Sequence, residues 1–579
     1  MIRPTNPLRK TWRGFRHLMK PSQIPADGKV PDDGFQRTNF FCRNRSSFAL
    51  SPLFAALLLA FVCGCGRSEP RADLVIVNGA EPESLDPAII SGFPDMRVVV
   101  SMFEGLLRLD PKTAQPRPAM AERWEISPDG LHYTFHMRTN LVWSTGEPIT
   151  AEDVVYSWIR ALKPETASEY AGQLFYIKNA EDFNAGKIKD PNLVAVHAPD
   201  PFTVEVELRN PTAFFLDLCA FQTLCVVPRR AIEKYGDNWL LAAHPLPCNG
   251  AYQLVTWRIN DKVRVTKNTN YWDAANTHIN TVDYLPIGNA TTALNLYETG
   301  QADIVWDKTT VPTELLDVLL KRPDFFSFTI LGNAFIRCNC ATGPFKDPRV
   351  RRALSMTVDR ERIVNKITKC GELPAYNFTP PGINHYQSPG KLADYDCAKA
   401  RQLLAEAGYP GGKGFPTVGY MFNSNSKVGV DMAVELQQMW HDELGIQIEL
   451  HEVEWKVYLS KMSTLDYELC GASWIGDYND PDTFLNMMVT DGGNNRTGWS
   501  NKKYDDLIRK ADEEADETRR IKMLQEAETL LIREEEPVIP LYFYVGFQYY
   551  NPKKIHGMYP NLLDNHPVSA LSMEADPKP

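Results

Sequence analysis

A short apolar run near the N-terminus limits how this chain can fold. It extends from Phe48 to Val62 and reads FALSPLFAALLLAFV. The run is too short to span a bilayer comfortably, because a transmembrane helix needs about 20 apolar residues. Most of the chain follows it. With 579 residues in total, the chain is too long for a single hydrophobic core, so we expect two or three lobes.

Residues 1–64 have the pattern of a bacterial export signal. A basic segment ending with Arg43 and Arg45 precedes the apolar run, and small residues lead up to Cys65. This order resembles a lipoprotein signal, with cleavage before Cys65 and a lipid on its sulfur. A single anchoring helix is the alternative. Because the leader is unusually long, a start codon further downstream is a second possibility. The expected location is the periplasm or cell envelope, with a lipid anchor in a membrane.

The charge of the chain argues against nucleic acid as a partner. The net charge is −10, and residues 1–64 contain ten basic and only three acidic residues, so the exported part is more acidic still. Nucleic-acid binding requires concentrated positive charge. An acidic protein of ordinary globular composition suits cationic or zwitterionic ligands better.

Eight cysteines follow Cys65. They are Cys219, Cys225, Cys248, Cys338, Cys340, Cys370, Cys397 and Cys470. Export leads to an oxidising compartment, so this even number permits disulfide bonds, whose pairing the sequence does not specify. Zinc is a weaker alternative, because these cysteines form no CxxC pair and no histidine lies at finger spacing. We expect no metal and no cofactor.

Helix and strand patterns alternate along the chain, which predicts α/β lobes. We expect a first strand within Arg71–Leu85, with Leu74–Val77 as its apolar run and a turn at Glu83–Pro87. We also expect a helix from Arg97 to Leu107 and a buried strand from Val538 to Tyr544. Thr150 with Asp153 three residues later predicts the start of a helix.

A further helix start is predicted at Asp347-Pro348, with an aspartate cap and proline in the first turn. Arg349, Arg351 and Arg352 follow, and we expect them to face solvent or to pair with acidic residues.

One stretch concentrates acidic and aromatic side chains. Residues 473–484 read SWIGDYNDPDTF and place Asp477 between Trp474 and Tyr478. The Asn479-Asp480-Pro481 segment that follows predicts a turn, because proline fixes its own φ angle and restricts the backbone of the residue before it. An acid between aromatic walls suits a ligand with a positive charge and an apolar body. A surface turn rich in aspartate is the alternative.

Segments along the whole chain resemble the family-5 solute-binding proteins. In order they include SLDP, FEGLL, WSTGEPITAEDVVYSW, NGAY, NTNYWD, PFKDPRVRRAL, GELPAYNFTPP, LLAEAGYPGGKG and IPLYFYV. The resemblance covers about residues 73 to 550, and the shared order of many segments makes it specific. The stretch around Asp477 is similar to the WxxDYNxP segment of the oligopeptide-binding proteins of ABC importers, whose aspartate meets the α-ammonium group of a peptide.

The resemblance implies an α/β, two-lobed periplasmic-binding-protein fold with an extra domain and a hinge between the lobes. Lobe I would comprise residues 73–93, 218–331 and 545–579. The extra domain would comprise residues 94–217, and lobe II residues 332–544. The ligand would lie between the lobes.

The same resemblance implies a solute-binding lipoprotein that captures peptides and delivers them to the permease and ATPase subunits of an ABC importer. It would act as a monomer and would not be an enzyme. Asp477 would bind the α-ammonium group, and Glu81, Tyr156, Trp474 and Tyr478 would also contact the ligand. The family includes binders of nickel complexes and opines, so a non-peptide ligand is an alternative.

The sequence argues against two functions from other classes. An exported hydrolase with paired carboxylates is the enzymatic alternative, but the sequence has neither an HExxH helix nor a GxSxG elbow. A calcium loop starting at Asp477 fails, because its sixth and twelfth positions hold Asp482 and Met488 instead of glycine and glutamate.

The positions that bind the peptide carboxylate in oligopeptide-binding relatives are altered here. Alignment through the matching segments puts Thr368, Met462 and Gly471 where basic residues are expected. Lys369 and Lys461 lie one residue away and would point in other directions. We therefore expect this protein to keep the ammonium site but to have a weakened carboxylate site, and so to accept longer, amidated or differently ended ligands. Free and amidated peptides should differ by less than about 1 kcal/mol in binding, the scale of a screened ion pair.

Overall fold

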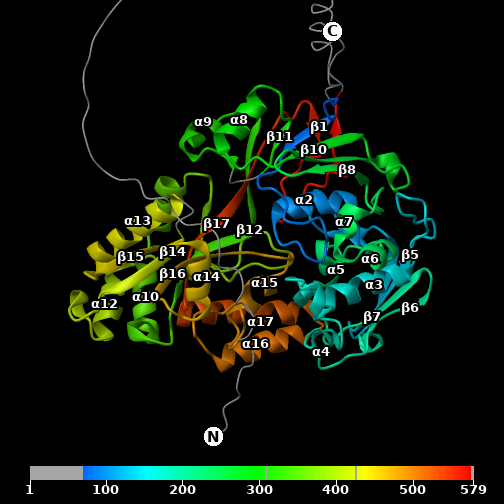
Figure 1. Ribbon diagram of the computed structural model, residues 1–579. Coiled ribbons are helices and arrows are strands. Elements are labelled where there is room, and N and C mark those ends of the chain that lie inside the picture. Colours follow the sequence, from blue (N-terminus) through cyan, green and yellow to red (C-terminus); the bar gives the residue numbers. More distant parts are fainter. Residues whose placement is uncertain (1–68, 307–309, 424–426, 575–579) are drawn as a thin grey trace, which may run out of the picture. The chain divides into compact units, whose positions relative to one another are not determined.

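The computed structural model describes residues 69–306, 310–423 and 427–574 (Figure 1). The predicted export signal, residues 1–64, and Cys65 lie outside these residues. Residues Arg71–Pro579 form one compact unit. No helix in the described ranges is both long and apolar enough to cross a membrane.

An eleven-stranded mixed sheet extends through this unit. From one edge to the other its strands are β15 (Ile448–Val453), β14 (Val418–Asn423), β16 (Leu469–Ile475), β12 (Phe325–Cys338), β17 (Val538–Tyr550), β11 (Ile304–Val305), β1 (Leu74–Val77), β10 (Thr281–Leu285), β9 (Lys262–Lys267) and β8 (Tyr252–Arg258), with β13 (Leu373–Pro374) against β17.

The two longest strands, β12 and β17, belong to both halves of the sheet (Figure 1). They pair in antiparallel fashion, and β12 continues the sheet toward β16 while β17 continues it toward β11. Their register shifts between Thr329 and Asn333. The predicted lobe boundaries, 331/332 and 544/545, fall within this irregular stretch, where regular ladder hydrogen bonds are interrupted.

A separate four-stranded antiparallel sheet lies in the region predicted as the extra domain. Its order is β4 (Ala121–Ile126), β5 (His132–Met137), β7 (Thr203–Glu207) and β6 (Val196–Asp200). Phe135 of β5 packs with Trp158 and Phe215 in one hydrophobic cluster. A two-stranded hairpin, β2 (Leu107–Leu109) and β3 (Pro116–Pro118), precedes this sheet.

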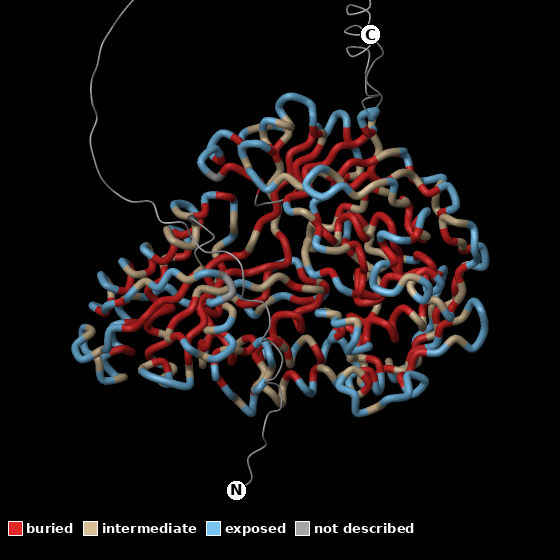
Figure 2. Tube along the Cα trace, in the orientation of Figure 1, coloured by how far each residue is buried: buried red, intermediate tan, exposed pale blue. Residues whose placement is uncertain are grey.

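Helices cover the sheets, and the strands they cover are largely buried (Figure 2). The longer ones are α2 (Phe93–Met102), α3 (Ala151–Leu162), α6 (Arg229–Tyr235), α8 (Ala290–Glu298), α10 (Pro348–Met356), α12 (Cys397–Glu406), α13 (Lys427–Leu444), α14 (Trp455–Ser463), α16 (Lys502–Asp512) and α17 (Glu517–Thr529). Trp440 of α13 is fully buried and its indole N–H donates to the carbonyl of Leu354 in α10.

Two predicted helix starts are confirmed. The Asp153 carboxylate accepts the backbone N–H of Thr150 at 2.9 Å, and α3 begins at the next residue. The Asp347 side chain accepts the N–H of Arg349 at 2.9 Å and caps α10. The first strand is also confirmed, and it is confined to the apolar run Leu74–Val77 of the predicted stretch.

Two local predictions need correction. Helix α2 begins at Phe93 and ends at Met102, because Pro94 favours an early first turn and the chain then becomes extended. Gly105 lies after the end of this helix, where an added Cβ would come within 2.9 Å of the Cys219 carbonyl oxygen. Arg351 is buried and pairs with Glu535 at 3.2 Å, one of the two outcomes expected for it, and its guanidinium also donates to the carbonyl of Phe345. Strand β17 continues to Tyr550, beyond the predicted end.

The cysteine prediction also changes. All eight cysteines after Cys65 are unpaired in the structure, so none of them forms the disulfide bonds that their even number permitted. Burial raises the pKa of Cys225 and Cys248 and thereby disfavours their thiolates, the form that binds zinc.

Candidate functional site

A cavity of about 330 Å³ is lined by segments that lie far apart in the sequence. They include residues 104–109 at the β2 strand, the bend of β12 at residues 330–331, the end of β16 at residues 475–478, and residues 562–565 near the C-terminus. This volume is within the range of small-molecule binding sites.

Asp477 lies just beyond β16 and lines the cavity. Its backbone N–H donates to the Thr483 hydroxyl at 3.2 Å, and the Gln173 amide donates to its Oδ2 at 3.1 Å. Burial raises the pKa of the Asp477 carboxyl to about 6, against the opposing effect of hydrogen bonds from Gln173 and Tyr170. Asp477 forms no ion pair with any described residue, so a ligand cation would supply its missing countercharge.

Tyr478 also lines the cavity, but most of its side chain belongs to the protein core. Its ring stacks on Phe214 with 4.1 Å between ring centroids. Its hydroxyl donates to Asp482 Oδ2 at 2.9 Å. The hydrogen-bonding capacity of Tyr478 is therefore largely used within the protein, and its ring forms a wall.

The structure does not bring the other three predicted site residues to this cavity. The Glu81 carboxylate accepts the Trp257 indole N–H at 2.7 Å and the Asn260 N–H at 2.9 Å, so it joins two loops. Tyr156 packs beneath the Arg229 guanidinium, 5.3 Å from its ring centroid. Trp474 precedes Ile475, which does line the cavity, and neighbouring strand residues face opposite sides of a sheet.

Sequence reasoning missed several charged residues of the cavity. They are Glu104, Arg108, Arg117, Asp217 and Asp564. The FEGLL and NTNYWD segments could have indicated part of this charged group. FEGLL contains Glu104, and NTNYWD contains Tyr271 and Trp272, which contact it.

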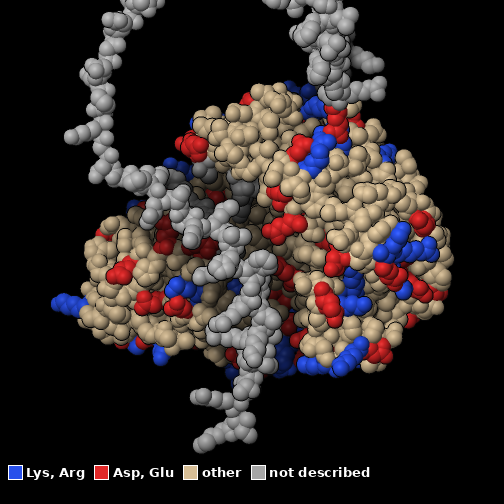
Figure 3. All heavy atoms as spheres, viewed as in Figure 1, with Lys and Arg blue, Asp and Glu red and all other residues tan. Residues whose placement is uncertain are grey.

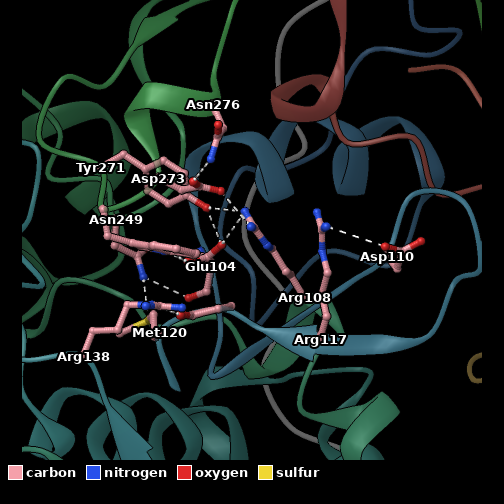
Figure 4. A network of polar contacts seen from close by, with 12 residues as sticks. Glu104, Arg108, Asp110, Arg117, Met120, Arg138, Asn249, Tyr271, Asp273 and Asn276 are labelled. Atoms are coloured by element: carbon pink, nitrogen blue, oxygen red, sulfur yellow. Dashed lines mark hydrogen bonds and ion pairs between the residues drawn. The ribbon is translucent and has the colours of Figure 1, made fainter. Parts of the chain in front are cut away.

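These partners surround a buried carboxylate. The Tyr271 hydroxyl donates to one oxygen of Glu104 (Figure 4). The Trp272 indole N–H donates to the other at 2.7 Å. The backbone N–H of Glu104 donates to Asn249. Two segments singled out for their family resemblance thus meet at the cavity wall.

The five positions at or beside those expected to bind the carboxylate of a peptide are absent from the cavity lining. The Thr368 hydroxyl donates to Glu372 at 2.7 Å, and Met462 is buried in a hydrophobic cluster. The Lys461 ammonium donates to Asp466 at 2.6 Å. These contacts supply no cation to the cavity.

Apolar side chains form much of the remaining wall. They include Phe93, Met96, Val100, Phe103, Leu107, Leu109, Phe221, Ile330, Leu331 and Ile475. On the outside of the molecule, basic and acidic side chains are interspersed over the described part of the face in Figure 3, without a continuous basic surface. The site thus suits a small ligand with apolar groups and charges of both signs.

Comparison with known proteins identifies the family. The sequence profile of the bacterial extracellular solute-binding proteins, family 5, matches residues 115–496. The chain belongs to this family. Its two-lobed α/β fold is that of the periplasmic binding proteins.

Curated family-5 relatives are similar over most of their length. The periplasmic oligopeptide-binding protein OppA of Salmonella typhimurium is 37% identical to this chain. The matched region covers 83% of this chain and 89% of the OppA sequence. The probable deoxycholate-binding periplasmic protein YgiS of Escherichia coli is 36% identical over 82% of this chain and 90% of its own.

Solved structures of family-5 proteins agree with the fold. The unliganded, open form of the murein tripeptide-binding protein MppA has a TM-score of 0.74 and 32% identity, covering 87% of this chain and 98% of that one. Haemophilus influenzae OppA in complex with the peptide RPPGFSPFR has a TM-score of 0.73 and 30% identity, covering 87% of this chain and 99% of that one.

Proposed function

We propose that this protein captures peptides outside the cytoplasm and delivers them to the permease and ATPase subunits of an ABC importer. The observation that carries the proposal is Asp477, a carboxylate without an ionic partner among the described residues, at the wall of a largely apolar cavity. The α-ammonium group of a peptide would neutralise it. Relatives named for oligopeptides support the ligand class.

Binding requires no chemical step. An extended peptide would form main-chain hydrogen bonds with the protein, so that affinity depends little on the side chains of the peptide. The ammonium group of the peptide would displace the Gln173 amide from Asp477 or share the carboxylate with it. An exported hydrolase is not favoured, because the relatives are named as binding proteins.

We also propose a division into lobes. We assign residues 73–93, 218–331 and 545–579 to lobe I, residues 94–217 to the extra domain and residues 332–544 to lobe II. Hydrophobic clusters around β5 with α3 and around α10 support the extra domain and lobe II. Helix α2, at the start of the proposed extra domain, packs in one cluster with β1 of lobe I. The interrupted β12–β17 ladder is the natural hinge.

A lipid on Cys65 would tether the protein to a membrane near its importer, and the protein would act there as a monomer. Metabolic lipid labelling tests the anchor. We expect label on the wild-type protein and none on Cys65→Ser. Label that persists on the variant would refute the lipid assignment without affecting the proposed ligand.

Replacement of Asp477 tests the ammonium site. Asp477→Asn keeps the size and removes the charge, which leaves a buried ligand ammonium unpaired. This change should cost about 3–5 kcal/mol, or several hundred-fold in peptide affinity by calorimetry. Asp466→Asn is the matched control, because Asp466 is exposed and pairs with Lys461 outside the cavity. Unchanged binding by Asp477→Asn would contradict the proposal.

The natural ligand can be identified directly. Mass spectrometry of small molecules released on denaturation of the purified protein should detect peptides. Release of a nickel complex, an opine or a bile acid instead would assign the protein to another ligand class. The relative YgiS is named as a probable deoxycholate-binding protein.

A further inference from the structure

Two arginines face each other across the β2–β3 hairpin, and both line the cavity. The register of the hairpin places Arg108 directly opposite Arg117. Side chains opposed in this way have Cβ atoms about 5 Å apart, and like charges there destabilise the hairpin. A pair of this kind therefore needs negative charge nearby.

Arg108 finds its negative charge within the protein (Figure 4). Its guanidinium donates to Asp273 at 2.7 Å and to the Tyr271 hydroxyl at 3.0 Å. Glu104 lies 3.9 Å away and completes the compensation. Arg108 is thus held in a fixed orientation beside the cavity.

Arg117 is compensated much less. Its nearest acidic group is Asp110, at 3.6 Å, and it forms no hydrogen bond with any described residue. The Nε atoms of both arginines are buried without a partner, and 34% of the Arg117 side chain remains exposed. Burial and the neighbouring charge of Arg108 lower the pKa of Arg117. An unsatisfied, partly buried guanidinium is costly unless an anion joins it.

We propose that Arg117, with Arg108 beside it, binds a carboxylate of the ligand. The planar guanidinium offers two parallel N–H donors that match a carboxylate. Since Asp477 lines the same cavity, the ligand class is a short peptide whose ammonium group and carboxylate both lie within about 330 Å³. This inference rests on the proposed peptide function and specifies its ligand.

The arginine pair changes the expectation drawn from lobe II. Thr368, Met462 and Gly471 supply no cation, but the hairpin of the predicted extra domain does. Free and amidated peptides should therefore bind differently. The carboxylate could belong to the C-terminus of the peptide or to an acidic side chain, and the two sources are separable by experiment.

The test begins with a library of di- and tripeptides, screened by thermal shift against the wild-type protein. The tightest binder is then compared by calorimetry with its C-terminal amide and with a version in which any acidic side chain is replaced by its amide. Each peptide is measured on wild type, Arg117→Gln, Arg117→Lys and the control Arg123→Gln. Arg123 pairs with Glu125 on the exposed face of β4, away from the cavity.

We expect the wild type to lose at least about tenfold in affinity when the bound carboxylate is amidated. Arg117→Gln should reduce that loss to about twofold or less, Arg117→Lys should give an intermediate loss, and Arg123→Gln should match wild type. The peptide version that shows the loss identifies the C-terminus or the side chain as the source.

Two results would overturn the inference and are distinguishable. If neither amidation changes wild-type binding by more than about twofold, no carboxylate is recognised, whether or not the variants fold. An undiminished loss in folded Arg117→Gln would place the cation elsewhere. A library without any binder would instead overturn the proposed peptide function itself.

Discussion

Asp477 and Asp217 line one cavity, and burial shifts both carboxyl groups toward neutrality. The Asp477 pKa is raised to about 6 and the Asp217 pKa to about 7, in each case mainly by burial. For Asp217 the nearby charge of Asp480 adds to the rise. The protonation states of these groups therefore change within the physiological range, with opposite consequences for ligand binding and for stability.

Peptide affinity should depend on pH through Asp477. The carboxylate form binds the ammonium group, so affinity is nearly full at pH 7 and above and falls as the pH drops through about 6. With a pKa of about 6, a shift from pH 7 to pH 5 should weaken binding about tenfold, while the peptide ammonium stays protonated. Calorimetry at both pH values checks this. In Asp477→Asn the remaining weak binding should lose this pH dependence.

Asp217→Asn should stabilise the ligand-free protein at high pH. The raised pKa means that the folded state binds more protons than the unfolded state, so stability falls as pH rises from about 4 through about 7. One oxygen of Asp217 is buried without a hydrogen-bond partner. After allowance for its partial exposure, we expect a gain on the order of 1–2 kcal/mol at pH 8 and almost none at pH 4. Urea unfolding at both pH values measures it, and an equal effect at both would contradict the assigned pKa.

At the level of secondary structure, the β12–β17 pair is where the two halves of the main sheet meet. The irregular stretch of β12 contains Gly332, next to the residues that line the cavity. A Cβ at this position would lie 2.5 Å from Ile475 Cδ1, 3.0 Å from the Tyr544 ring and 3.2 Å from the Trp474 carbonyl oxygen. The close approach of three segments requires glycine here.

Gly332→Ala should therefore destabilise the protein. Crowding against the Trp474 carbonyl and the Tyr544 ring should cost about 1–3 kcal/mol in urea unfolding, since backbone atoms must shift. Gly288→Ala is the matched control, because no atom lies within 4 Å of its added Cβ, and it should change stability by no more than about 1 kcal/mol. Equal effects of the two substitutions would show that Gly332 is not crowded.

At the level of the whole molecule, the region predicted as the extra domain contacts the end of β16. Gln173 donates to Asp477, and Phe214 stacks on Tyr478. Both contacts join residues that are more than 250 positions apart in the sequence and lie beside the cavity. A ligand at Asp477 would bridge the same two regions, which predicts that it stabilises a closed arrangement.

A bound peptide should make the molecule both more compact and more stable. Small-angle X-ray scattering should give a smaller radius of gyration with peptide than without it. At a peptide concentration of 100 times Kd, unfolding should require about 2.7 kcal/mol more free energy. Asp477→Asn at the same peptide concentration is the control. A radius unchanged by saturating peptide would show that binding does not involve closure.

Local features of this chain were predictable because they depend on residues a few positions apart. The Thr150 and Asp347 helix starts and the strand at Leu74–Val77 are of this kind. The family resemblance extended such local signals to the two-lobed fold and to Asp477, since many short segments kept one order along the chain.

The composition of the cavity was not predictable in this way. Glu81 and Trp474 lie in resembling segments, yet Glu81 is bound by Trp257 and Asn260, and Trp474 faces the opposite side of its strand from Ile475. The arginine pair became visible only through the register of β2 with β3. Side-chain direction and strand register follow from packing between segments far apart in the chain, so they were established by the folded structure.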